Sequence, residues 1–150
     1  MFYLVLLIAL LTGCSSNEKM TINNSYLSLS GESESWKVKS YDIEMTPNMS
    51  RAGNGKVIMK DKTNYNTDLF SIRVHAVIDN NDKIIQGKSV TSSGGKIDIA
   101  QETTGTTEIT EPIPVDNINN IYMVIKWQDT NKNKTSEERI NLFSKKTFFN

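Results

Sequence analysis

The sequence predicts an all-β fold, an immunoglobulin-like or related Greek-key β-sandwich of about seven to eight strands. Three observations support this class. Apolar and polar residues alternate with the period of a strand over much of the chain, and clusters of Gly, Pro, Asn and Asp interrupt the alternation at short intervals. No segment has the periodicity of an amphipathic helix.

The first long strand is expected at residues 36–45, where apolar and charged side chains alternate. The apolar side chains stand at even-numbered positions up to Val38 and at odd-numbered positions after it. A bulge or bend near Ser40 would return the apolar side chains of both halves of the strand to one face. Turn-forming residues occupy 46–55, so a long loop is expected before the next strand at 56–60.

The clearest strand is predicted at residues 69–79. Its polar face includes Arg73 and His75, and its other face is continuously apolar. The apolar residues are Phe70, Ile72, Val74, Ala76 and Ile78. Residues 79–82 are all Asp or Asn and predict a tight turn into a second strand at 83–90, so that the two strands form a β-hairpin.

Further strands are predicted in the C-terminal half. Two short extended segments are expected at 97–99 and 106–111, the second ended by prolines. Residues 121–127 are the most apolar of the domain and should form a central strand buried on both sides. Residues 137–143 are its expected partner, across a turn at 129–135 that is rich in Asn and Lys.

An apolar segment without charge opens the chain at residues 1–13. Its core has about the length of the h-region of a secretory signal and falls well short of the roughly 20 residues that a membrane-spanning helix needs. We therefore expect residues 1–13 to be a signal peptide. The Lys or Arg that usually precedes such a core is absent, and a start codon upstream of Met1 would account for this.

The residues Leu11, Thr12, Gly13 and Cys14 resemble the lipobox of bacterial lipoproteins, in which small residues before a cysteine allow cleavage once the thiol carries a diacylglycerol. The resemblance implies that the signal peptidase cleaves between Gly13 and Cys14 and that Cys14 is lipidated. Two acyl chains anchor a protein stably, whereas one binds only marginally. The alternative is an ordinary signal peptide with a chance cysteine at its cleavage site.

Three parts are therefore expected: a lipoprotein signal peptide at 1–13, the lipidated cysteine and a flexible tether at 14–26, and one sandwich domain at 27–150. We expect the lipid to hold the protein on the extracytoplasmic face of a bacterial cell membrane. Cys14 is the only cysteine, so the domain has neither a disulfide nor a thiol nucleophile. Basic and acidic residues number 17 each, and this balance does not indicate a nucleic-acid partner.

Short motifs at both ends of the domain suggest a family. The segment 31–36 reads GESESW, and Trp127 is followed after a turn by residues 137–142, which read EERINL. These motifs resemble those of small uncharacterised lipoproteins of Gram-positive bacilli, which carry a GESExW-like start and a Trp-turn-Glu-Glu-Ile finish. The resemblance implies export, lipidation and a β-rich domain. It implies no activity, and it carries no functional residue over to this chain.

Several residues are weak candidates for a binding site. Glu32 and Glu34 next to Trp36 could form an acidic and aromatic patch for a basic partner or peptide, although the favoured interpretation is that Trp36 fills the core. Tyr65, in a polar loop, is the better candidate for an exposed aromatic contact. His75 could serve as a general base, but its strand parity favours an ordinary surface histidine.

The sequence lacks the motifs of catalytic and metal sites. Residues 129–133 imitate the start of a calcium loop, but Lys134 stands where glycine is needed and Ile140 where glutamate is needed. No GxSxG motif is present. We therefore expect no catalytic residue, no metal ion and no cofactor.

The function favoured by the sequence is a non-enzymatic binding or interaction module whose partner is a protein, a peptide or a wall glycan. A small extracytoplasmic enzyme using carboxylates is one alternative, and a pocket with convergent carboxylates would favour it. An accessory solute-binding lipoprotein is another, although such proteins normally need two lobes and a longer chain. Fold analogy decides little, because sandwiches host many functions.

Overall fold

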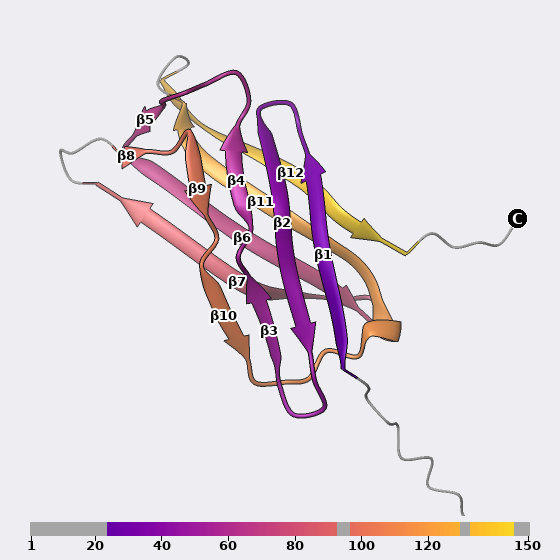
Figure 1. The fold of residues 1–150 in the computed structure, drawn as a ribbon. Coiled ribbons are helices and arrows are strands. Elements are labelled where there is room, and N and C mark those ends of the chain that lie inside the picture. The colour runs from indigo at the N-terminus through magenta and orange to yellow at the C-terminus, as the bar shows by residue number, and fades with distance from the viewer. Residues whose placement is uncertain (1–23, 93–96, 130–132, 146–150) are drawn as a thin grey trace, which may run out of the picture.

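The computed structural model of the chain describes residues 24–92, 97–129 and 133–145. The protein is all-β, and its antiparallel sheets form two layers that face each other, an arrangement consistent with a β-sandwich (Figure 1). Within the described residues, no helix has the length and apolar character needed to cross a membrane.

The first sheet consists of β1 (Ser25–Glu32), β2 (Trp36–Met45), β3 (Ser50–Gly53), β4 (Lys56–Met59), β9 (Gln101–Thr103) and β10 (Thr106–Ile109). Strand β2 is its centre, because β1 pairs with one side of β2 while β3 and β4 pair with successive parts of the other side. Strand β10 extends the sheet beyond β3, and β9 extends it beyond β4.

The second sheet has the order β12-β11-β6-β7. Its strands are β6 (Leu69–Ile78), β7 (Asn81–Thr91), β11 (Ile118–Asp129) and β12 (Lys134–Ser144). A small third sheet pairs β5 (Asn66–Thr67) with β8 (Ile97–Asp98), and a 3-10 turn, η1 (Val115–Asn117), leads into β11.

The core lies between the two main sheets. Its largest fully buried side chains are Trp36, Tyr41, Phe70, Ile43, Met45, Ile72, Ile99, Ile118, Ile121, Met123, Ile125 and Ile140. The ring of Trp36 lies 5.6 Å from that of Phe70 and 5.4 Å from that of Trp127, so three aromatic rings from both sheets meet in the core. The interpretation of Trp36 and Trp127 as core residues is confirmed.

The strongest sequence patterns are confirmed strand by strand. Val38 and Tyr41 are both fully buried, and Ser40 between them has a φ of +52°, which is the bend that the change of parity predicted. Strand β6 has the predicted faces, and Asp79 and Asn80 form the tight turn into β7 with positive φ at both residues.

Three expectations about strands are corrected. The tether was expected to reach residue 26, but β1 begins at Ser25, and β3 lies inside the loop expected at 46–55. The β11 strand is not buried on both sides, because Lys126 is exposed and Val124 is partly exposed on its outer face. The immunoglobulin-like Greek key, as a specific form of the sandwich, stays a prediction.

The two layers contact each other along both edges of the sandwich. At one edge, a Cβ on Gly31 of β1 would lie 2.5 Å from the main-chain oxygen of Asn141 in β12, so only glycine allows this approach. At the other edge, the ammonium of Lys88 in β7 lies 2.6 Å from the carboxylate of Glu102 in β9. These contacts lie along the edges of the sheets, between β1 and β12 and between β7 and β9.

Candidate functional site

The outer face of the β12-β11-β6-β7 sheet carries polar side chains at its centre. Because side chains alternate across a strand, the residues of β6 between its buried ones point outward, among them Ser71, Arg73 and His75. The register places Lys126 opposite Ser71 and Tyr122 opposite His75. Two adjoining groups result, a depression around Arg73 and a cluster around His75.

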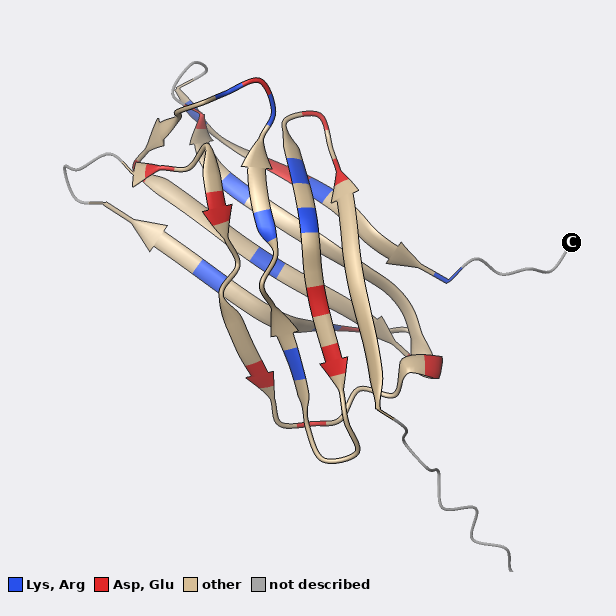
Figure 2. Cartoon of the chain, viewed as in Figure 1, with Lys and Arg blue, Asp and Glu red and all other residues tan. Residues whose placement is uncertain are grey.

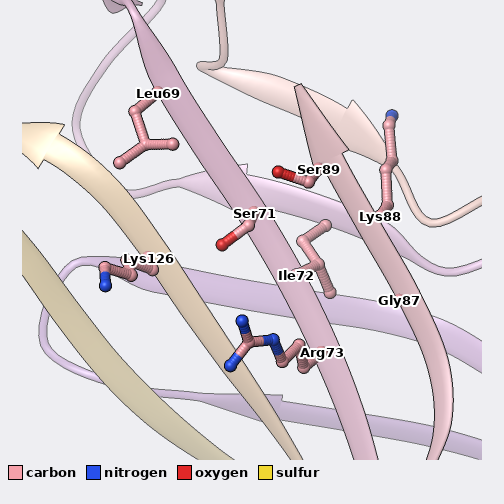
Figure 3. Close-up of a pocket in the computed structure, with 8 residues that line it drawn as sticks. All are labelled: Leu69, Ser71, Ile72, Arg73, Gly87, Lys88, Ser89 and Lys126. Atoms are coloured by element: carbon pink, nitrogen blue, oxygen red, sulfur yellow. The ribbon is translucent and has the colours of Figure 1, made fainter. Parts of the chain in front are cut away.

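The cationic depression is a shallow pocket of about 360 Å³ (Figure 3). Its lining residues are Leu69, Ser71, Ile72, Arg73, Gly87, Lys88, Ser89 and Lys126. Gly87 lies opposite Arg73 in the β6-β7 pair, and a Cβ there would meet no atom within 4 Å. Glycine therefore opens the depression, and the directly paired Ser71 and Ser89 add two hydroxyl groups to it.

The charge of the depression is positive. Arg73 and Lys126 are both exposed, and neither forms an ion pair with any residue that the structure describes. Lys88 contributes differently, because its ammonium is held by Glu102 on the other sheet, and Figure 3 shows it pointing away from Arg73. Arg73 and Lys126 are thus the two cations available to a ligand.

The cluster beside the depression contains the histidine of the chain. The Nδ1 atom of His75 lies 3.0 Å from one carboxylate oxygen of Asp82, and the hydroxyl of Tyr122 donates a hydrogen bond of 2.5 Å to the other. The rings of His75 and Tyr122 are stacked, with centroids 4.6 Å apart. The guanidinium of Arg139 lies 3.5 Å from the centroid of the Tyr122 ring, a cation–π geometry.

The hydrogen bonds of the cluster affect its acidic groups. The hydroxyl of Tyr122, and to a lesser extent His75, stabilise the charged carboxylate and hold the pKa of Asp82 below its ordinary value. The same hydrogen bond raises the pKa of Tyr122, because it favours the protonated hydroxyl. Asp82 is therefore a carboxylate held by two partners, and it is not a free base.

His75 lies on the outer face, as its parity predicted, but it is not a freely solvated side chain. Its side chain is 18% exposed, and both the stack on Tyr122 and the contact with Asp82 fix the ring. These contacts explain why the side chain of His75 is mostly covered although it lies on the outer face. The cluster adjoins the cationic depression without lining it, since His75 and Arg73 are neighbours on the same face of β6.

The other candidates from the sequence lie elsewhere. Trp36 is fully buried and presents no surface to a partner. The expectation that Tyr65 is exposed is wrong: it is 9% exposed, and its hydroxyl lies 3.2 Å from the carboxylate of Asp129, so burial and a hydrogen bond hold it inside. Glu32 and Glu34 are both exposed. Gly13 and Cys14, the predicted cleavage and lipidation sites, lie outside the described residues.

Glu34 and Tyr65 do line one pocket, at the end of the sandwich near the β1-β2 turn. This pocket of about 280 Å³ also contains Asp61 and Asp129, so three carboxylate-bearing residues line it. Trp127 and Met59 provide its apolar wall. Among the described residues, no group of three or more His, Cys, Asp or Glu side chains could hold a metal ion.

The GESESW segment has a structural role. Glu138 of β12 accepts a hydrogen bond of 2.5 Å from the hydroxyl of Ser33 and one of 3.0 Å from the main-chain N–H of Ser35. Lys60 donates a 2.6 Å hydrogen bond to the main-chain oxygen of Ser33 and pairs with Glu32 at 3.4 Å. Ser33 and Ser35 thus tie the β1-β2 turn to β12 of the opposite sheet. Glu32 and the main chain of Ser33 bind Lys60, which follows β4 of the same sheet.

Sequence reasoning missed Arg73, Lys126 and the two serines of the depression as a group. The face of β6 could be derived from alternation, but the residues beside it depend on the register with β7 and β11. Gly87 was a usable signal, because an isolated glycine within a strand can mark a site where a ligand approaches the main chain. Comparisons with protein-family models, curated proteins and solved structures gave no match.

Proposed function

We propose that the protein is a lipid-anchored extracytoplasmic lipoprotein whose sandwich is a non-enzymatic binding module for an acidic peptide segment. The cationic depression carries this proposal, because Arg73 and Lys126 are exposed and form no ion pair within the described residues, beside an opening left by Gly87. Glu137 lies opposite Lys126 in the β11-β12 pair and forms no ion pair with it. A guanidinium binds a carboxylate through two parallel hydrogen bonds, and an ammonium adds a second positive charge. Ser71 and Ser89 offer hydroxyls to the peptide amides.

The binding test uses pentaglutamate as the probe and isothermal titration of the full chain in a non-ionic detergent. Arg73→Ala and Lys126→Ala should each weaken binding by about tenfold, since each removes one charge-assisted contact. Arg73→Lys should recover only part of the affinity, because it keeps the charge and loses the planar fork. Lys134→Ala, an exposed cation outside the depression, is the matched control and should bind like the wild type.

Gly87→Val tests the shape of the site separately from its charge. A Cβ at this position would meet no atom within 4 Å, so we expect the variant to keep its fold while the valine side chain fills the depression. Loss of pentaglutamate binding in a variant with an unchanged melting temperature would support the proposal. Unchanged affinity in Gly87→Val and Arg73→Ala together would refute it.

The anchor has its own test, because the lipobox resemblance supports it independently of the depression. Cys14→Ser should abolish incorporation of a fatty-acid analogue during growth and move the protein from the membrane fraction to the precursor or shed fraction. Label retained by the mutant would contradict lipidation of Cys14. The binding proposal would survive that result, since its probe acts on the sandwich.

A small enzyme using carboxylates is the second candidate, and the pocket with Glu34, Asp61 and Asp129 favours it. Paired carboxylates can supply the acid and the base of a hydrolysis. Hydrolysis of a wall-glycan preparation by the wild type, lost in Asp61→Asn and retained in Arg73→Ala, would favour the enzyme over the binding module.

A further inference from the structure

The outer face of the first sheet concentrates lysines at one of its ends. A shallow trough of about 720 Å³ runs over Ile58, and lysines from β2 and from the turn after β4 line it. Lys56 of β4 lies beside the trough, opposite Lys39. The lysine surface consists of Lys37, Lys39, Lys56, Lys60 and Lys62. Figure 2 shows blue segments on this half of β2 and red segments on its other half.

The positive charges of the lysine surface are poorly compensated. Lys39 and Lys56 lie directly opposite each other in the β2-β4 pair, and like charges in this position destabilise a sheet. Lys60 pairs with Glu32 at 3.4 Å. In the part of the chain that the structure describes, the other four lysines form no ion pair.

Five acidic residues lie near these lysines. Two of them, Glu34 and Asp129, line with Asp61 the neighbouring pocket that also contains Lys60 and Lys62. Glu32 is the cross-strand partner of Lys37 but pairs with Lys60, and Asp61 lines the trough. Asp42 lies on the same face of β2 beyond the bend at Ser40, where Tyr26 is its hydrogen-bond partner. The uncompensated positive charge therefore lies on Lys37, Lys39 and Lys56, which form no ion pair within the described residues.

Protection of a sheet edge does not explain these lysines. Exposed lysines often serve to block edge-to-edge pairing. Here β2 lies between β1 and β4, and β4 lies between β2 and β9, so both strands are interior at this end. Edge protection therefore leaves the pair of opposed lysines, Lys39 and Lys56, without an explanation.

The register also shows where this surface lies relative to the start of the sandwich. Ser25, the first residue of β1, pairs with Met45, whereas Glu32 at the other end of β1 pairs with Lys37. Seven steps of an extended strand separate these ends by about 23 Å. The chain therefore enters the sandwich at the end opposite the lysine surface.

We propose that the lysine surface binds an extended phosphate polyanion lying along the trough. Exposed, flexible ammonium groups suit a polymer with distributed charge, because they neutralise successive anions without a fixed geometry. The choice of a polymer over a bilayer rests on the proposed anchor at Cys14, because the chain that would carry the lipid enters the sandwich at the end opposite the lysine surface. The polymer site lies on the opposite sheet from the cationic depression and is independent of it.

The test measures binding of fluorescently labelled long-chain polyphosphate to the full chain in a non-ionic detergent, at low and high salt. The wild type should bind, with affinity that falls steeply as salt rises, and the triple variant Lys37→Gln/Lys39→Gln/Lys56→Gln should bind at least about tenfold more weakly. Polyphosphate should also raise the melting temperature of the wild type and not that of the variant. Without polyphosphate the variant should be at least as stable as the wild type, because the Lys39–Lys56 repulsion is gone.

A matched triple, Lys83→Gln/Lys134→Gln/Lys145→Gln, removes the same charge from residues outside the lysine surface. Equal weakening by both triples, or no binding by the wild type, would overturn the proposal. Phosphatidylglycerol vesicles form the last arm, and vesicle binding that depends on the three lysines as strongly as polyphosphate binding would assign the surface to a membrane instead. Because detergent replaces the bilayer in the polymer assay, failure of the Cys14 anchor would not change the polyphosphate result.

Discussion

Trp36 stabilises the fold through packing between the two sheets. Its ring is fully buried and contacts those of Phe70 and Trp127. Trp36→Ala should lower the free energy of unfolding by about 3–5 kcal/mol, because it removes a large buried aromatic side chain. Urea unfolding of the chain from Ser15 onward, followed by circular dichroism, measures this loss, and a variant as stable as the wild type would contradict the core position.

His75 lies on the outer face of β6 and contacts neighbouring side chains. Its place in the alternating pattern alone therefore underestimates its contribution to stability. A surface substitution usually changes stability within about 0.5 kcal/mol. The stack on Tyr122 and the contact with Asp82 lead us to expect a loss of about 1 kcal/mol for His75→Ala in the same unfolding assay. A loss near zero would mean that the cluster does not stabilise the sheet.

The lowered pKa of Asp82 predicts a contribution to stability that depends on pH. The native carboxylate ionises more readily than the unfolded one, so its contribution is present above the ordinary pKa of 3.8 and is lost as pH falls through the lowered value. In Tyr122→Phe, which lacks the main cause of the shift, stability should fall less between pH 5 and 2 than in the wild type.

Asp98 serves as the internal reference for this comparison. Its pKa is also lowered, by hydrogen bonds from the main-chain N–H groups of Tyr65 and Ala100, and it remains in both proteins. The difference between the two urea-derived stability profiles therefore reports Asp82. Superimposable profiles for the wild type and Tyr122→Phe would show that the hydroxyl of Tyr122 does not stabilise the carboxylate.

At the scale of elements, the approach of β1 to β12 depends on Gly31. A Cβ at this position would lie 2.5 Å from a main-chain oxygen, which cannot move without shifting β12. We expect Gly31→Val to destabilise the sandwich by about 1–3 kcal/mol through overpacking. Gly87→Val is the control, because its side chain enters open space; equal melting temperatures for the two variants would contradict the close contact.

The elements also show which parts of the fold a single sequence can reveal. Strand β6 was predictable because five apolar residues alternate along it, and the bend at Ser40 was predictable from a change of parity. Strand β3 was not, because four residues reading SRAG carry little alternation, and their strand conformation depends on pairing with β2 and β10. Long-range pairing, which the sequence does not encode locally, also determines the cationic depression.

At the scale of the molecule, charge is distributed unevenly although the net charge is zero. On the first sheet, Asp42 and Glu44 occupy the half of β2 near Ser25, and Lys37 and Lys39 occupy the other half (Figure 2). The second sheet carries the cationic depression on its outer face. The chain enters the sandwich at the Ser25 end, away from the lysine surface.

The central claim, that the cationic depression binds acidic segments, is tested most directly by a nuclear magnetic resonance titration. Amide spectra of the ¹⁵N-labelled chain from Ser15 onward would be recorded while pentaglutamate is added. We expect the largest saturable shifts at Ser71, Arg73, Gly87 and Ser89, which line the depression. Spectra that do not change, or shifts confined to the pocket around Glu34 and Asp61, would contradict the account.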